Sequence, residues 1–452
     1  MNDTASHYPR TDRPPHPGFR EAFVFWLKLG FLSFGGPAGQ IALMHTELVE
    51  RRRWIGEKRF LHALNYCMLL PGPEAQQLAT YIGFLLHRSI GGVVAGLLFV
   101  LPSLFILVAL SWVYVSFGNT PLVAGLFYGI KPAVTAIVLH AAWRIGSRSL
   151  KNMALRAIAV TAFLAIFVLH LPFPTIVLGA ALTGIAGARF APQLFAGSAH
   201  GASAASYGSA VIDDDTPLAP HTRFRRGRLV GVLLLGALAW LLPMGLLTAG
   251  LGWQHVYTQM GWFFTKAALL TFGGAYAVLP YVYQGAVMQF GWLSATQMID
   301  GLALGETTPG PLIMVVAFVG FVGAWGALPL GADHAFAGAA LAAALVTWFT
   351  FLPSFVFILA GAPLVESTHG NLKFSAPLSA ITAAVVGVVL NLALFFAWHV
   401  LWPQGFSGSV EWPAAVITIA AAFALFRSKR GVIEVLAACA ACGLVVSLLG
   451  AP

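Results

Sequence analysis

Long apolar runs recur along the whole chain, and they constrain its fold more than any other feature. Most have about 17 to 25 residues, the length that an α-helix needs to cross about 30 Å of hydrocarbon. They lack the period-two alternation of membrane β-strands, which argues against a barrel. We count thirteen such runs, at residues 23–43, 60–86, 90–116, 121–143, 154–170, 172–188, 229–250, 259–281, 298–325, 336–361, 376–400, 413–426 and 431–449.

The composition leads to the same class of protein. Of the 452 residues, 58% are hydrophobic and 9% are charged, whereas about a quarter of the residues of an average soluble domain are charged. We therefore predict an all-α polytopic protein of the lipid bilayer. The net charge of +9 could suggest nucleic acid as a partner. In a membrane protein a basic excess more simply marks loops held in the cytoplasm, so we predict no nucleic-acid partner.

Signatures of enzymes and cofactor sites are missing. The sequence has no G-x-x-x-x-G-K-[ST] stretch, so nothing indicates ATP hydrolysis by a P-loop. It also lacks the H-E-x-x-H and G-x-S-x-G motifs of two familiar classes of enzyme. Cys67, Cys439 and Cys442 lie in apolar runs, and the C-x-x-C lies within AACAACG, where helix packing is preferred over metal or redox chemistry. We predict no enzyme activity, cofactor or metal. Energy for any transport should then come from an ion gradient, a partner or the substrate's own gradient.

An internal repeat organises the chain. At an offset of 238, LSFGG at 32–36 matches LTFGG at 270–274, and PGP at 71–73 matches PGP at 309–311. After an insertion of thirteen residues the offset becomes 251, which pairs Pro102 and Ser103 with Pro353 and Ser354. Chance does not keep register over such distances, so we predict two copies of one structural plan.

The repeat divides the chain into five parts. Residues 1–20 are polar and proline-rich without a cleavage site, so we expect a retained cytoplasmic tail. The first repeat covers 21–188 and the second covers 251–452. Between them, 189–228 is rich in Ala, Gly and Ser, which predicts a flexible hydrophilic linker in the cytoplasm, and the apolar run 229–250 predicts an additional linking helix.

Basic residues distribute unequally between equivalent loops. The loop 45–59 carries five Lys or Arg, whereas its equivalent 283–297 carries none. Four basic residues follow the fourth segment of the first repeat, within 144–156, and 395–412 has none. Since basic loops stay in the cytoplasm, equivalent loops lie on opposite faces, and the repeats are inverted as in many secondary transporters.

Two topologies fit the thirteen segments. If all of them span, the two basic loops of the first repeat fall on opposite faces. If the first two segments of each repeat are re-entrant hairpins, broken at SFGGP, LPGPE, TFGGA and TPGPL, 22 of the 25 Lys and Arg lie in the cytoplasm. We prefer this model of nine spans and four hairpins over thirteen plain spans. Broken backbone at membrane depth is tolerated where it is buried or lines a cavity.

The four breaks predict an anion site. A helix that restarts inside the membrane presents unpaired N–H groups and the positive end of its dipole, and glycine allows close approach of a ligand. The alternative is that Gly and Pro only kink packed helices, and Gln76 and Gln77 could donate to an oxyanion or only hold helices together. The candidate binding residues are Ser33, Phe34, Gly35, Gly36, Pro71, Gly72, Pro73, Thr271, Gly273, Gly274, Thr308, Pro309, Gly310 and Pro311, with Thr307 as a further hydroxyl donor.

Five charged residues inside apolar segments are candidates for binding or coupling, because ionisable groups are costly there. Lys131 is the candidate for a fixed positive charge at the binding site, and its alternative role is an ion pair with Glu74. Lys28 and Lys266 could serve the site or snorkel to the interface. Glu74 and Glu306 flank the PGP motifs and could carry a coupling proton or neutralise a lysine.

The motifs SFGGPAGQIALM, RRRWI, LLPGPEAQQLATYIG and VLPSLF, followed by TFGGAYAVLP, GWL and TPGPL, resemble the chromate ion transporter family in its long, two-domain bacterial form. The resemblance covers 19–450. It implies a multi-pass protein of the bacterial inner membrane that exports chromate, coupled to the proton motive force or to sulfate exchange, and that confers chromate resistance. It also implies that the motif residues form the functional core.

The sequence departs from symmetry at Glu74, whose counterpart is Leu312, so the two PGP sites are not chemically equivalent. A transporter of sulfate or another tetrahedral oxyanion, a passive anion channel and a membrane scaffold remain as alternatives. Chromate or sulfate is the expected partner, and a homo-oligomer is an open possibility.

Overall fold

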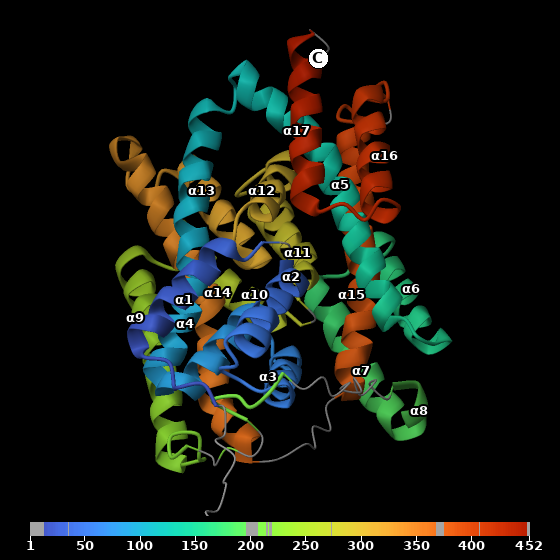
Figure 1. The fold of residues 1–452 in the computed structure, drawn as a ribbon. Coiled ribbons are helices and arrows are strands. Elements are labelled where there is room, and N and C mark those ends of the chain that lie inside the picture. Colours follow the sequence, from blue (N-terminus) through green and yellow to red (C-terminus); the bar gives the residue numbers. More distant parts are fainter. Residues whose placement is uncertain are drawn as a thin grey trace, which may run out of the picture.

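The computed structural model describes residues 13–34, 36–195, 207–213, 216, 219–272, 274–367, 375–405 and 407–449 (Figure 1). The described residues form helices, with an isolated bridge between Ile55 and Ile212 as their only β-type pairing. The predicted all-α membrane fold is therefore confirmed. In chain order the elements are α1 (Phe19–Leu32), α2 (Gly36–His45), η1 (Thr46–Arg51), α3 (Glu57–Leu69), α4 (Glu74–Phe117), α5 (Pro121–Ser149), α6 (Met153–Phe167), α7 (Phe173–Phe190), α8 (Pro192–Phe195), α9 (Arg226–Leu251), α10 (Val256–Leu270), α11 (Ala275–Tyr283), η2 (Gln284–Gln289), α12 (Ala295–Thr307), η3 (Leu312–Met314), α13 (Val315–Ala327), η4 (Ala332–His334), α14 (Ala335–Ser367), α15 (Ser375–Leu401), α16 (Trp412–Phe426) and α17 (Val432–Leu448).

Within the residues that the structure describes, six helices are long and apolar enough to cross a membrane. They lie at Glu74–Phe117, Pro121–Ser149, Phe173–Phe190, Arg226–Leu251, Ala332–Glu366 and Ala376–Leu401. The other three of the nine predicted spans are the apolar helices α6, α16 and α17, with 15, 15 and 17 residues. They are somewhat shorter than the roughly 20 residues of a typical span. The additional helix α9 runs along one edge of the molecule, and α6 to α8 lie at the opposite edge (Figure 1).

The four segments predicted as hairpins are each interrupted at their Gly/Pro motif. α1 ends at Leu32 before SFGG, and α10 ends at Leu270 before TFGG. α3 and α12 end just before the two PGP motifs, after 13 residues each. At 1.5 Å per residue, helices of this length reach about 20 Å and cannot cross the bilayer alone.

α4 consists of two antiparallel legs. At its turn His87 and Arg88 leave the helical conformation, and Arg88 has φ 59° and ψ −160°. Glycines let the legs approach, because a Cβ on Gly83 would lie 2.5 Å from the carbonyl oxygen of Gly91. The first leg, 74–86, therefore returns beside α3 as the second half of a hairpin, and the second leg, 89–117, crosses the membrane.

Contacts between distant segments decide between the two topologies. Arg59 at the start of α3 is paired with Glu366 at the end of α14. The Tyr114 hydroxyl donates to Asp300 over 2.8 Å, and the Phe173 N–H donates to the Gln284 side chain over 2.9 Å. With nine spans and four hairpins, each pair lies on one face of the membrane. With thirteen plain spans, each pair would lie on opposite faces, so the structure supports the hairpin model.

The two repeats match in backbone detail as well as in sequence. Each first hairpin ends in a π-helix, η1 at Thr46–Arg51 and η2 at Gln284–Gln289, at the offset of 238. A residue with positive φ follows each, Arg53 at 51° and Gly291 at 60°. The same sequence offset thus carries the same change of chain direction in both repeats.

The described part of the linker packs against the protein, a contact that the predicted flexible linker did not include. The N–H groups of Val211 and Ile212 donate to the carbonyls of Arg53 and Trp54, and Gly56 donates to Ile212, over 2.8 to 3.1 Å. His221 is within 3.1 Å of the Leu85 carbonyl oxygen. Composition predicts flexibility here because it carries no information on such backbone pairing.

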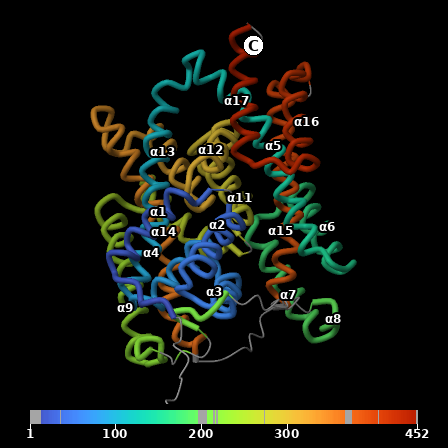
Figure 2. Tube along the Cα trace, viewed as in Figure 1, coloured from blue at the N-terminus to red at the C-terminus, as the bar shows by residue number. Residues whose placement is uncertain are grey.

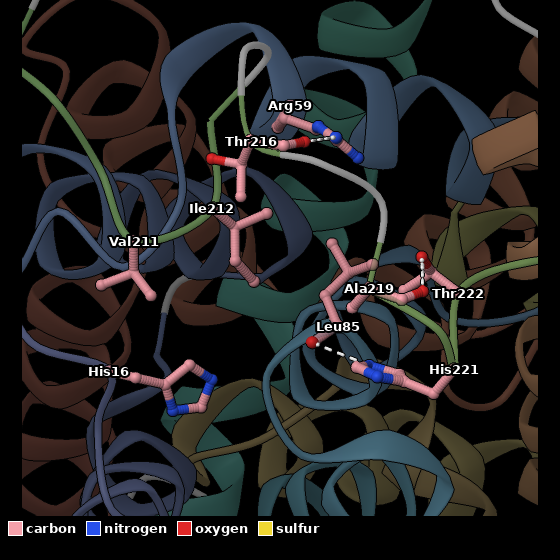
Figure 3. Close-up of a pocket in the computed structure, with 9 residues that line it drawn as sticks. All are labelled: His16, Arg59, Leu85, Val211, Ile212, Thr216, Ala219, His221 and Thr222. Carbon is pink, nitrogen blue, oxygen red and sulfur yellow. Dashed lines mark hydrogen bonds between the residues drawn. The ribbon is translucent and has the colours of Figure 1, made fainter.

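A cavity of about 150 Å³ lies between this linker segment, the start of α3 and the turn of α4. Figure 3 shows His16 and His221 on one side of it and Arg59 with Thr216 on the other. It is separate from the Gly/Pro breaks, whose residues are not among those that line it.

Candidate functional site

The four Gly/Pro breaks are joined in pairs across the two repeats. The N–H of Gly72 donates to the carbonyl of Thr271 over 2.7 Å, and the N–H of Gly310 donates to the carbonyl of Ser33 over 2.8 Å. The PGP motif of each repeat is thus bonded to the SFGG or TFGG motif of the other. Figure 2 shows α2 and α11, the helices that follow two of these breaks, in the centre of the molecule.

Glycine is required at both donor positions. Gly72 has φ +128° and Gly310 has φ +100°, which side chains disfavour. A Cβ on Gly72 would lie 2.2 Å from the Ser354 hydroxyl, and one on Gly310 would lie 2.7 Å from the Ser103 Cβ. Ser103 and Ser354 are themselves repeat counterparts, so each PGP glycine packs against the serine of the opposite repeat.

Gly36 and Gly274 have a different environment. Both have positive φ, +70° and +98°, and no heavy atom lies within 4 Å of a Cβ built on either. Gly274 is nevertheless buried. The start of α11 therefore borders open space at the Cβ position of Gly274.

Helix N-termini face these breaks without side-chain caps. The residues Pro73, Gly274 and Pro311 are the N-caps of α4, α11 and η3, and none of the three caps has a side-chain hydrogen bond. The first N–H groups of a helix have no partner inside it. These ends therefore offer donors and a positive dipole end to an anion.

Each junction also contains a glutamine. Gln40 donates to the carbonyls of Ser33 and Gly310 over 3.2 and 2.5 Å. Gln77 donates to the Pro71 carbonyl over 2.8 Å and to Ser354 over 3.3 Å. The amide oxygens of both are buried without a partner. Sequence reasoning missed Gln40, because its partners are backbone carbonyls and no sequence motif indicates such contacts.

The hydroxyls expected to face an anion are bonded elsewhere. Ser33 and Thr271 donate to the carbonyls of Leu29 and Ala267, four residues earlier, over 2.6 and 2.7 Å. The next two hydroxyls also donate within their own helix turn, Thr307 to Leu304 and Thr308 to Gly305. The prediction that these groups donate to a ligand is not met here, because a helix-end hydroxyl readily bonds back to the preceding turn. Ser103, by contrast, has a buried hydroxyl without a partner.

The two glutamates beside the PGP motifs differ. Glu74 begins α4 and is partly exposed, with no hydrogen-bond or ion-pair partner for its carboxylate within the described part of the chain. Glu306 is buried near the end of α12 and accepts a hydrogen bond from the Tyr276 hydroxyl of α11. Glu306 therefore joins α12 to α11, the helix that begins after Gly274.

Lys131 is not paired with Glu74, so that alternative is wrong. Its Nζ lies 3.6 Å from Oδ2 of Asp300, a residue that sequence reasoning did not single out. Asp300 precedes Thr308 by eight residues, about 12 Å along the helix axis. The Lys131 charge is thus at some distance from the breaks and already has a counter-charge.

Lys28 and Lys266 are exposed on the outer sides of α1 and α10. Lys28 lines an open surface depression with Arg20, Glu21 and Arg52, and Lys266 lies 5.8 Å from the Trp262 ring. Their placement agrees with the snorkelling alternative.

Phe34 is exposed at the first break, and Gly35 and Gly273 lie outside the described residues.

The chain was compared with known proteins. The model of the chromate transporter family matches residues 20–185 and 258–444. A chromate transport protein of Pseudomonas aeruginosa is 33% identical over 383 residues, which is 83% of this chain and 80% of that protein. A chromate transport protein of Cupriavidus metallidurans is 29% identical over 412 residues, which is 91% of this chain and 88% of that protein. No solved structure matches the chain.

Proposed function

The chain belongs to the chromate transporter family, and we propose that it exports chromate from the cytoplasm as a secondary-active transporter of the bacterial inner membrane. In this proposal the protein confers chromate resistance and is not an enzyme. Residues 21–188 and 251–452 act as the two transporting repeats. The cytoplasmic linker 189–228 and the transmembrane helix 229–250 connect them.

The observation that carries the proposal is the pair of junctions, Gly72 with Thr271 and Gly310 with Ser33. They bring interrupted helices from two inverted repeats into contact, with uncapped N-termini beside them. Interrupted helices with this arrangement bind anionic groups in secondary transporters, and movement of one repeat against the other gives alternating access. A static pore or a scaffold would not need such a reciprocal arrangement.

The energy for export can come from the membrane potential. Moving one elementary charge across 100 mV is worth about 2.3 kcal/mol, so a dianion leaving a cell with a negative interior gains about 4.6 kcal/mol. This would support an outward concentration ratio of roughly 2,000-fold. Export of a dianion therefore does not require ATP.

Sulfate is the second candidate substrate, because it has the same shape and charge as chromate. A site made of N–H groups selects an anion by its shape and charge, so it would bind both. Exchange of sulfate for chromate would use the same junctions. A passive anion channel is the remaining alternative, and it predicts flux that saturates weakly and does not show exchange.

Uptake of chromate and sulfate into everted membrane vesicles tests the proposal, with the potential and the pH gradient imposed separately. We expect vesicles that contain the protein to accumulate chromate when their interior is positive, and to exchange preloaded sulfate for external chromate. Equal rates with and without the protein would contradict chromate transport. Flux without exchange of preloaded anion would favour a channel.

A further inference from the structure

Asp300 is a buried carboxylate with one oxygen left unbonded. It lies on α12 and is 2% exposed. Its Oδ2 accepts a hydrogen bond of 2.8 Å from Tyr114 and lies 3.6 Å from Nζ of Lys131. Its Oδ1 is buried and has no hydrogen-bond partner. An unbonded oxygen of a buried carboxylate is costly, and binding a proton would lower that cost by removing the negative charge.

A second buried ion pair, between the start of α3 and the end of α14, is fully bonded. Glu366, at the end of α14, accepts from Arg59 with one oxygen and from Tyr81, over 2.5 Å, with the other. Arginine keeps its proton in proteins, whereas a buried lysine can lose one. The Arg59–Glu366 pair is therefore fixed, and the Lys131–Asp300 pair is the one that a proton can change.

Titratable groups lie between Asp300 and the start of α5, the end of that helix which the nine-span topology places outside. The side chain of Lys131 is 28% exposed. One helical turn nearer the start of α5, the Tyr128 hydroxyl donates to Glu411 over 2.6 Å. Glu411 lies in the loop before α16, which the nine-span topology places outside. Exchangeable groups thus run from the outer surface toward the buried carboxylate.

The charged and titratable groups around Asp300 are few. Lys131 of α5 and Tyr114 of α4 contact it. Of the other helices packed against α12, α13 carries no titratable side chain, and on α15 His399 is within 3.0 Å of the Phe395 carbonyl oxygen. On α17, Glu434 is paired with Arg430, and Cys439 packs its backbone against Gly129. Asp300 is therefore the carboxylate whose proton controls the Lys131 charge.

We propose that Asp300 is a proton-binding site and that it takes up a proton when the oxyanion binds. The inference rests on the proposed function. In the anion-free protein the Asp300 carboxylate neutralises Lys131. When Oδ1 binds a proton from external water, Lys131 is left with an uncompensated positive charge that attracts the anion. Binding of proton and anion is then cooperative, and by linkage each tightens the other equally.

The size of the effect follows from the distance. At about 12 Å, and with an effective dielectric constant of about 20, one freed charge changes the affinity about tenfold for each charge of the ligand. A dianion should therefore bind about a hundredfold more tightly to the protonated protein, and a monoanion about tenfold.

The test measures proton uptake by the purified full-length protein in weak buffer on addition of chromate, at several values from about pH 5 to about pH 9, where buried carboxyls titrate. We expect up to about one proton taken up per bound anion. Asp300→Asn should remove the uptake and bind chromate tightly at every pH. Proton exchange by chromate itself is the same for all variants and cancels in the comparison.

Glu366→Gln, which lacks a buried carboxylate outside the breaks, is the matched control and should keep the uptake. Glu306→Gln tests the carboxylate near Gly274 as the alternative proton-binding site. Should Asp300→Asn fail to insert, the double variant Lys131→Gln with Asp300→Asn leaves no charge unpaired, and it must also lack the uptake. Chromate binding without proton uptake in the unmodified protein overturns the inference. Loss of uptake in Glu306→Gln, or persistence in the Asp300 variants, overturns it too. Failure of the unmodified protein to bind chromate contradicts the proposed function instead.

Discussion

The N–H of Gly72 lies 2.7 Å from the carbonyl oxygen of Thr271, and this bond joins the PGP motif of the first repeat to the TFGG motif of the second. Its counterpart, from Gly310 to Ser33, measures 2.8 Å. Each repeat thus gives one donor to the other and takes one acceptor from it. The site depends on both repeats together, and substitutions of the two donor glycines should have equivalent effects.

The glycines of the breaks should divide into two groups. Gly72→Ala and Gly310→Ala should lower both the yield of folded protein and transport, since the new methyl group would meet Ser354 or Ser103 at 2.2 to 2.7 Å. Gly36→Leu and Gly274→Leu meet no neighbour at Cβ. They should leave the protein inserted, at a backbone cost of about 1 to 3 kcal/mol, but abolish transport by filling the space for the anion.

Membrane yield and vesicle transport of the four variants check this prediction. Gly245→Leu, in α9, is the control, because its Cβ position is also open. Near-normal transport by Gly36→Leu and Gly274→Leu would contradict an anion site beside these glycines and would indicate that both serve only in packing.

The inverted arrangement predicts labelling from opposite faces. Arg51 in η1 and Met288 in η2 have similar exposure, 69% for the Arg51 side chain and 68% for Met288. In a background with the exposed Cys442 replaced by alanine, Arg51→Cys should react with an impermeant maleimide only from the cytoplasm, and Met288→Cys only from outside. Reaction of both from one side would contradict inverted repeats.

The positions of these elements could be predicted because the sequence repeats them. The offset of 238 and the Gly/Pro motifs fixed where helices break, and the basic residues of 45–59 fixed the side of one loop. The hairpin turn at His87 and Arg88 fell in the gap between two predicted segments. Each of these signals is local in sequence or repeats at a fixed spacing, which is why sequence alone suffices.

The Arg59–Glu366 pair should act as a structural anchor. Glu366 is 2% exposed in its side chain and Arg59 is 11% exposed. Removing one partner leaves a buried charge, so Glu366→Gln should lower stability by about 3 to 5 kcal/mol, measured as a fall in Tm in detergent. Arg59→Gln combined with Glu366→Gln should recover part of the loss.

The exposed Arg51–Glu47 pair is the comparison for the anchor. Arg51→Gln should change stability by less than about 1 kcal/mol, because exposed ion pairs contribute little. Equal losses for Arg51→Gln and Glu366→Gln would show that burial does not set the strength of these pairs.

Lys131 should couple energetically to Asp300 and not to Glu74. Lys131→Gln alone leaves the buried Asp300 carboxylate without its cation, so the Tm should fall. Addition of Asp300→Asn should restore it, whereas addition of Glu74→Gln should not. A double-mutant cycle on Tm for both pairs measures this coupling, and recovery by Glu74→Gln would contradict the observed pairing.

Docking of the linker should weaken in acid. Burial lowers the pKa of His221, although the carbonyls of Leu85 and Phe84 act in the opposite direction. Since the folded pKa is depressed, docking favours the neutral ring. Its contribution is complete above the unfolded pKa of about 6.5 and is lost as the pH falls below that value.

Hydrogen exchange of the Val211 and Ile212 amides, which donate to Arg53 and Trp54, measures this docking. Protection should decrease from about pH 7 to about pH 5 after correction for intrinsic exchange. In His221→Ala it should be low and independent of pH. Protection that stays constant in the unmodified protein would exclude His221 as the group responsible.

Partners that are distant in sequence could not be predicted. Asp300 appears in ATQMIDGLALGET as a single acid near the start of an apolar run, and nothing in that run indicates Lys131 or Tyr114. Gln40 is equally unmarked, because it bonds backbone carbonyls. Lys131 could be recognised as a buried charge, but its neighbour depends on how α5 packs against α12, and helical periodicity does not determine that.

The junction of Gly72 with Thr271 also has a consequence for synthesis. Thr271 leaves the ribosome about 200 residues after Gly72, which at about 5 to 20 residues per second is about 10 to 40 seconds. Until then the Gly72 N–H lacks its partner at a depth where an unpaired group costs several kcal/mol. The first repeat therefore cannot complete the hydrogen bonding of its PGP motif while it is being translated. It must remain partly hydrated or held by the insertion machinery until the second repeat arrives to complete it.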